Sequence, residues 1–149
     1  MPQNATIRPS RFTMSLFSFA GKRPSGIGVR SVRLAPCPAS PNCVCSEDAD
    51  TQHAIEPFRL NMPAAQAWAA AREAVLAQPR TRIVTEGPDY LHAECTSAVF
   101  GYVDDLELHL RAGEGIIAVR SASRLGYSDF GVNRKRIERL RSVLAARKV

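Results

Sequence analysis

Four side chains in the first third of the chain have the chemistry to bind zinc or to form a disulfide. They are Cys37, Cys43, Cys45 and His53, spaced C-x5-C-x-C-x7-H. Structural zinc sites usually contain closely spaced cysteine pairs, so this spacing favours zinc only weakly, and we predict no metal and no cofactor. A disulfide between Cys37 and Cys43 across a proline-rich turn is favoured over zinc, while reduced thiols are the usual state in the cytosol.

A second set of polar side chains recurs at alternate positions of the predicted strands. His92 and Glu94 lie in one strand, Asp105 and Glu107 in the next, and Arg120 in the one after that. Successive side chains of a strand point to opposite faces, so these residues share one polar face. A histidine beside carboxylates suits acid–base catalysis, but cross-strand ion pairs explain the same pattern. An enzyme using His92, Glu94 and Arg120 is therefore an alternative hypothesis, and no catalytic residue is predicted.

The start of the last predicted helix is basic, with Arg134, Lys135 and Arg136 in its first turn. The helix macrodipole disfavours cations there by roughly 0.3–1 kcal/mol each. Either nearby aspartates (Asp104, Asp105 or Asp129) neutralise these residues, or an anion such as phosphate, carboxylate or a lipid headgroup binds to them. The residues of this candidate anion site are Arg120, Ser121, Ser123, Arg124, Asn133, Arg134 and Arg136, with Asn133 as the predicted helix cap.

The elements that position these groups follow from periodicity and from turn residues. We predict an edge strand over 53–60, because Pro57 cannot donate to a ladder. Helices are predicted over 63–78 and 134–147, with Trp68 mostly buried. The strands predicted between the helices are 81–86, 90–97, 102–110 and 115–124. Short connections favour an antiparallel meander of about five strands with both helices on one face, which is an α+β fold.

The net charge of +6 arises in the first part of the chain. Residues 1–36 contain six basic and no acidic side chains, whereas residues 37–149 contain fourteen of each sign. A domain without net charge gives little support to polyanion binding, so nucleic acid is not an expected partner. Residues 1–36 also lack apolar periodicity, so we predict a disordered basic tail followed by a single domain over 37–149.

No apolar run approaches the roughly 20 residues of a membrane-spanning helix. The apolar stretch at 12–20 lacks a convincing cleavage site for a signal peptide. We therefore expect a cytoplasmic protein without a transmembrane segment, with export as the alternative.

Four segments carry a resemblance to a known family. They are CPASPNCV at 37–44, YLHAE at 90–94, VDDLE at 103–107 and RSASRLGYSDFGVNRKRIE at 120–138. In these segments the chain resembles the bacterial and plastid family catalogued as domain of unknown function 1499, from about Leu16 to Leu144. The resemblance implies a start near Met14, so that residues 1–13 are an extension or a misassigned start. It also implies serine in place of Cys45, and it carries no activity.

The sequence thus favours a non-catalytic binding or interaction module for an anionic small molecule or an acidic protein surface. An enzyme on the polar face and a redox-responsive protein acting through Cys37 and Cys43 are the alternatives.

Overall fold

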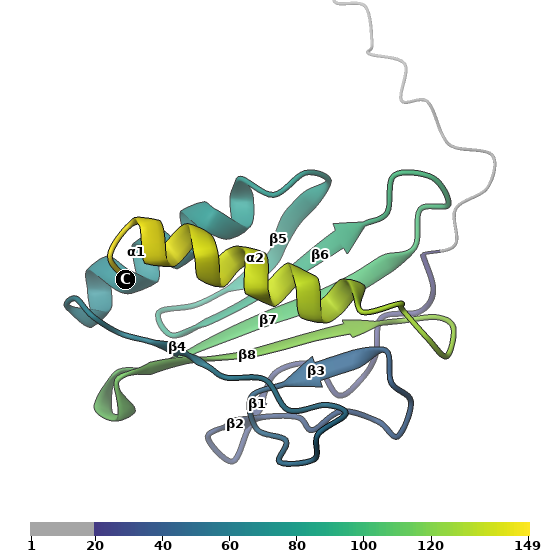
Figure 1. Ribbon diagram of the computed structural model, residues 1–149, viewed down its shortest axis with the longest axis horizontal. Coiled ribbons are helices and arrows are strands. Elements are labelled where there is room, and N and C mark those ends of the chain that lie inside the picture. The colour runs from purple at the N-terminus through teal and green to yellow at the C-terminus, as the bar shows by residue number, and fades with distance from the viewer. Residues whose placement is uncertain (1–19) are drawn as a thin grey trace, which may run out of the picture.

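The computed structural model describes residues 20–149, which form an antiparallel sheet with two helices on one face (Figure 1). The predicted α+β fold is confirmed. Along the sheet, the strands follow the order β3 (Cys43–Cys45), β8 (Ile116–Ser123), β7 (Val103–Arg111), β6 (Tyr90–Thr96) and β5 (Thr81–Glu86). A sixth short strand, β4 (Phe58–Arg59), pairs with the beginning of β8.

The two helices, α1 (Ala64–Leu76) and α2 (Val132–Ala146), cover the apolar face of the sheet. Alternation along the strands places Leu106, Leu108 and Val119 on that face, where all three are buried. Helix α2 contributes the stripe Ile137, Leu140 and Leu144 at helical spacing. Neither described helix, at 13 and 15 residues, has the length and hydropathy that crossing a bilayer requires.

Helix α1 meets the core through small side chains. Ala67, Ala71 and Ala74 are buried, and Trp68 beside them is partly buried against the core. Trp68 is thus packed against the core, as predicted, although part of its side chain stays accessible. Alanines at this spacing let the helix backbone approach the sheet closely, and the next residue is turned about 100° around the helix, away from that contact.

The two ends of the predicted meander also differ from expectation. The edge strand predicted over 53–60 forms only at Phe58–Arg59, because the chain before it turns at Asp50 and His53 rather than running along β8. The cysteine segment, predicted as a turn, instead includes β3, which pairs with the end of β8.

The segment 20–36 is ordered against the polar face, although the sequence predicted a disordered tail over 1–36. It contains the hairpin of β1 (Val29–Arg30) and β2 (Arg33–Leu34), and Leu34 is buried with Cys45 and Ala118. The segment also contacts the sheet through the Arg23 side chain and the Gly28 backbone N–H. Contacts of this kind do not produce apolar periodicity, so the sequence pattern did not indicate that the segment is ordered. The possible extension at 1–13 lies outside the described residues.

Candidate functional site

The charged side chains on the polar face of the sheet are largely buried, and ion pairs join them to one another. Arg124 donates to both Asp105, at 2.7 and 2.8 Å, and Glu94, at 2.7 Å. His92 Nε2 lies 2.8 Å from Asp105 Oδ1, and both of these side chains are buried. Glu94 is also bound by Arg82 on β5 and by Arg23 of the N-terminal segment. Every charged group of this cluster therefore has a partner of opposite charge.

Glu107 is the most enclosed acid of the polar face and has no exposed surface. Its Oε1 accepts from the Tyr90 hydroxyl and from the Gly28 backbone N–H, each at 2.8 Å. Its Oε2 accepts from Arg120 at 3.2 Å. A buried carboxylate with three donors is satisfied, so it has no remaining need for a ligand.

These pairings fix the charge state of the polar face. Burial would raise the pKa of Glu94, but the guanidinium groups of Arg23, Arg124 and Arg82 lower it to about 2. Burial would likewise raise the pKa of Asp105, and Arg124 and His92 hold it below its ordinary value. Both carboxylates are thus ionised at neutral pH and bound to cations. Of the three residues of the enzyme hypothesis, Glu94 and Arg120 form ion pairs, and His92 is hydrogen-bonded to Asp105.

The predicted anion site is divided between the two faces of the sheet. Ser121 on β8 lies on the helix side. Arg120 on β8 and Arg124 just after it point to the polar side, where they pair with Glu107, Asp105 and Glu94. The strand alternation that defined the polar face separates these arginines from the serines. Arg120 and Arg124 therefore do not converge with the serines as the sequence predicted.

The other half of the predicted site does converge, on Asn133. Its Oδ1 accepts from Ser121 Oγ at 2.7 Å, and its Nδ2 donates to Ser123 Oγ at 2.8 Å and to the backbone oxygen of Asn42 at 3.2 Å. Asn133 is fully buried inside the first turn of α2, so the prediction that it caps the helix was wrong. Asp129 accepts the backbone N–H groups of Gly131 and Asn133 instead, each at 2.9 Å.

The three basic residues of the first helical turn have different surroundings. Arg134 donates to the backbone oxygens of Ala54 and Gln52. Arg136 binds Asp104 at 2.7 Å and Asn133 Oδ1 at 2.7 Å. Lys135 is exposed. The first explanation from the sequence, neutralisation by an aspartate, thus describes Arg136, while Arg134 is held by carbonyl groups.

Beside Arg136, the surface is hollowed between the C-terminal end of α1, the end of β6 and the start of α2. This hollow has a volume of about 260 Å³ and is lined by three arginines, Arg80, Arg136 and Arg139, with Asp104 as the one acid. Cys95 lies at its floor, and burial raises the pKa of that thiol. We call this feature the arginine hollow.

Two of the three arginines were missed by the sequence analysis. Arg80 precedes β5, has a φ of 50°, and donates from Nε to the backbone oxygen of Thr96 at 3.0 Å. Arg139 is exposed one turn after Arg136, and within residues 20–149 its guanidinium has no acidic or hydrogen-bonding partner. The i, i+3 spacing of Arg136 and Arg139 is a weak signal for a shared helix face, whereas Arg80 joins them only through the fold.

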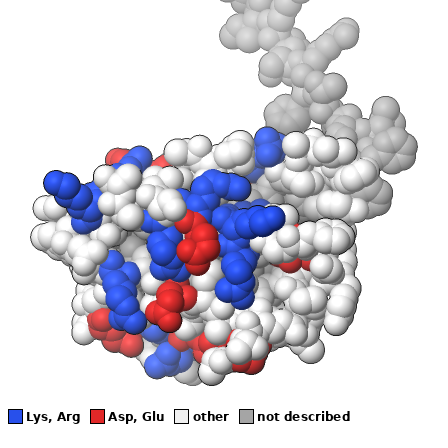
Figure 2. All heavy atoms as spheres, in the orientation of Figure 1, with Lys and Arg blue, Asp and Glu red and all other residues white. Residues whose placement is uncertain are grey.

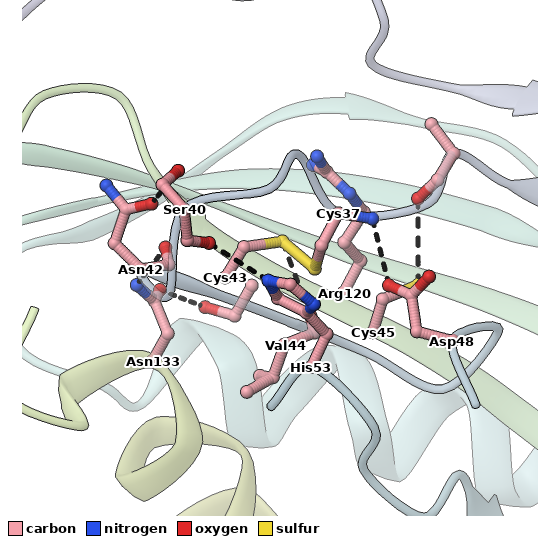
Figure 3. Close-up of a disulfide and its surroundings, with 12 residues drawn as sticks. Cys37, Ser40, Asn42, Cys43, Val44, Cys45, Asp48, His53, Arg120 and Asn133 are labelled. Carbon is pink, nitrogen blue, oxygen red and sulfur yellow. Dashed lines mark hydrogen bonds between the residues drawn. A yellow bond between two sulfur atoms is a disulfide. The ribbon is translucent and has the colours of Figure 1, made fainter. Parts of the chain in front are cut away.

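A disulfide between Cys37 and Cys43 closes a short loop before β3 (Figure 3). Inside the closed loop, Asn42 donates to the backbone oxygen of Gly126 at 2.8 Å and accepts the Ser123 N–H at 2.9 Å. The loop therefore holds the connection between β8 and α2.

His53 binds the same loop from the other side (Figure 3). Its Nε2 faces the backbone oxygen of Ser40 at 3.0 Å and its Nδ1 faces Asp50 at 2.8 Å. Both neighbours are acceptors, so the doubly protonated imidazolium satisfies both contacts. The Ser40 carbonyl raises the pKa of His53; burial opposes this rise and Asp50 adds to it. Among the described residues, no group of three or more His, Cys, Asp or Glu side chains is arranged to hold a metal ion.

Comparison with known proteins identifies one family. The model of the family described as protein of unknown function (DUF1499) matches residues 33–144. No significant match was found among curated proteins or among solved structures.

Proposed function

The chain belongs to the DUF1499 family, and we propose that this member is a non-catalytic binding module that takes an anionic group into the arginine hollow. The ligand class follows from the charge of the lining: three guanidinium groups and one carboxylate. Arginine suits phosphate and carboxylate because its planar fork donates two parallel hydrogen bonds.

The observation that carries this proposal is the imbalance of charge inside the arginine hollow. Asp104 is matched by Arg136, so Arg80 and Arg139 supply positive charge that no acid of the lining offsets. On the polar face, by contrast, each arginine is bound to a carboxylate. A ligand anion entering the polar face would have to displace an existing partner, whereas one entering the hollow would not.

The size of the hollow favours a small group. Its volume of about 260 Å³ is just under the range of roughly 300–1,000 Å³ that is typical of pockets for drug-sized ligands. It suits a free phosphate or carboxylate, or the charged end of a larger molecule whose remainder lies outside.

The test is a titration of the full-length protein with inorganic phosphate at constant ionic strength, with the thermal midpoint as readout. A site bound only in the folded state predicts saturable stabilisation, about 2.7 kcal/mol at a hundred times the Kd. Arg139→Gln should abolish most of this response without harming the fold, because Arg139 has no partner within the described residues.

Lys135→Gln is the matched control, since Lys135 is an exposed cation of the same helix that does not line the hollow. If wild type, Arg139→Gln and Lys135→Gln respond alike to phosphate, the hollow is not an anion site and the proposal is wrong.

A further inference from the structure

One end of the molecule, next to the arginine hollow, exposes large apolar side chains. Phe130 is 88% exposed and Tyr127 is 73% exposed, and the other members are between 43% and 77% exposed. We call this feature the apolar end, and its residues are Val99, Phe100, Leu125, Tyr127, Phe130 and Val132. Single exposed apolar residues are common on proteins, but several at one end of the molecule mark an interaction surface.

Strand register brings these residues to one end of the molecule, from two loops and from the first residue of α2. Thr96 pairs with Val103 where β6 turns into β7, and Asp104 pairs with Ser123 at the end of β8. The β6–β7 hairpin and the β8–α2 loop therefore leave the same end of adjacent strands (Figure 1). Val132 belongs to the apolar end and also lines the arginine hollow, so the two features are continuous.

The arginine hollow beside the apolar end has an excess of positive charge, with three arginines against Asp104. Figure 2 shows basic side chains along the helix side, with acidic side chains between them, and a mostly uncharged surface towards the hairpin and loop. A surface that combines exposed aromatic side chains with adjacent cations is complementary to an anionic membrane, because aromatic rings favour the headgroup region and cations favour anionic lipids.

The β8–α2 loop holds its aromatic side chains outward at an energetic cost. Phe130 has a φ of 53°, a conformation that bulky residues rarely adopt. The backbone around it is held by Asp129, which binds Gly131 and Asn133, and by Ser128 Oγ, which accepts the Phe130 N–H at 3.3 Å. Nothing within the described part of the protein buries the Phe130 ring, so packing inside the fold does not account for this geometry.

The first described residues of the chain add a second argument, because they lie at the apolar end. The backbone at Gly21 lies against Leu125 of the apolar end: a Cβ atom built there would be 2.9 Å from Leu125 Cγ. The sequence just before this point contains Phe12, Phe17 and Phe19 together with Arg8 and Arg11, and no acid. The sequence that precedes this point is therefore basic and aromatic.

We propose that the apolar end docks on the surface of an anionic lipid bilayer, with Tyr127 and Phe130 in the headgroup region and a lipid phosphate in the arginine hollow. This inference rests on the proposed function, since the phosphate is the anionic group that the hollow takes. It differs from attachment through a spanning helix, because the contacts are made by two loops and by arginines at the surface.

The experiment is co-sedimentation of full-length protein with vesicles of phosphatidylcholine alone and with vesicles in which a third of the lipid is phosphatidylglycerol. Wild type should sediment with the anionic vesicles only. Tyr127→Ser/Phe130→Ser should weaken this binding by roughly tenfold or more, because two large apolar side chains no longer leave water. Arg139→Gln should weaken it too, and added salt should weaken it further.

Val32→Ser is the matched control, since Val32 is an apolar residue, 74% exposed, on the distant β1–β2 hairpin, and it should leave binding unchanged. Phosphate titration of Tyr127→Ser/Phe130→Ser separates the two proposals, because that variant keeps all three arginines of the hollow and should keep its phosphate response.

Three results would overturn the membrane inference while leaving the arginine hollow intact. The first is phosphate stabilisation of wild type without vesicle binding. The second is equal binding of wild type and Tyr127→Ser/Phe130→Ser, which would place the contact in the residues before Ala20. The third is binding to an acidic peptide such as polyglutamate in preference to anionic vesicles, which would make the partner a protein.

Discussion

Individual carboxylates on the polar face differ in their hydrogen-bond partners, and the sequence does not show which partners each one has. Glu94 and Glu107 are two glutamates on neighbouring strands, yet Glu94 is bound by arginines from β5, from β8 and from the N-terminal segment, while Glu107 is bound by a tyrosine, a backbone N–H and one arginine. A buried carboxylate is stable only when its partners compensate for the lost hydration. At this scale, the polar face stabilises the fold at neutral pH and makes it sensitive to acid.

Glu94 supplies a test of that sensitivity. Its pKa of about 2 lies below the ordinary value of 4.5, so its contribution to the free energy of unfolding is present above pH 4.5 and is lost as the pH falls towards 2. The full contribution is on the order of 3 kcal/mol. Urea unfolding of Glu94→Gln should therefore show a shallower loss of stability between pH 4.5 and pH 2 than wild type.

The matched control is Glu56→Gln, because the Glu56 side chain is 76% exposed and, within residues 20–149, its carboxylate pairs only with Arg59, at 3.5 Å. Its acid profile should follow that of wild type. An unchanged profile for Glu94→Gln would mean that its ion pairs do not contribute to stability.

At the scale of elements, the start of α2 depends on groups from three other parts of the chain. Asp129 supplies the acceptors for the first N–H groups, and Asn133 joins the helix to β8 through Ser121 and Ser123 and to the disulfide loop through Asn42. Because the same turn carries Arg136, its geometry also sets one side of the arginine hollow. The helix start, the disulfide loop and the hollow are therefore connected through direct contacts, so a change in one is expected to affect the others.

Asp129→Ala tests the helix start. Loss of a capping acceptor costs about 0.5–2 kcal/mol, and this variant removes the acceptor of two backbone N–H groups and of Asn133 Nδ2. The free energy of unfolding should fall by an amount in the upper part of that range. Burial raises the pKa of Asp129, but the N–H groups of Asn133 and Gly131 hold it below its ordinary value, so the loss should be largest at neutral pH and disappear in acid.

Ser128→Ala is the control for this loop, because Ser128 accepts one longer hydrogen bond, at 3.3 Å from the Phe130 N–H. Its effect should be smaller than that of Asp129→Ala. Equal effects of the two variants would show that Asp129 does not hold the helix start.

At the scale of the whole molecule, the sheet has two covered faces. The helices cover one, and the segment 20–36 covers part of the other through Leu34, Arg23 and the Gly28 N–H. Without that segment, the buried carboxylates Glu94 and Glu107 would each lose a donor. The basic segment that the sequence assigned to a tail is thus part of the folded domain from Ala20 on.

Two truncations test this division of the N-terminal region. A protein that starts at Met14 should keep the thermal midpoint of the full-length chain. A protein that starts at Cys37 should lose at least about 1.5 kcal/mol, the lower value for burying a large apolar side chain, because Leu34 is removed. Equal midpoints for both truncations would show that residues 20–36 do not stabilise the sheet.

Local patterns were sufficient for most of the architecture. The four central strands and both helices lie within a few residues of their predicted bounds, because alternation and helical spacing report directly on which side chains face a core. The candidate site was predicted less well. Arg136 and Asn133 do lie together, but Arg120 and Arg124 are on the other face, and Arg80 and Arg139 were missed.

The sequence by itself determined the α+β class, the two faces of the sheet and the family, because each depends on residues near one another in the chain or on long motifs. Only the tertiary structure decided which charges pair. Ion pairs such as Arg23 with Glu94 and Arg136 with Asp104 join residues 71 and 32 positions apart, and such pairs leave no periodic trace in a sequence. The arginine hollow and the apolar end arise for the same reason: their residues come from separate loops and helices that meet only when the sheet has formed.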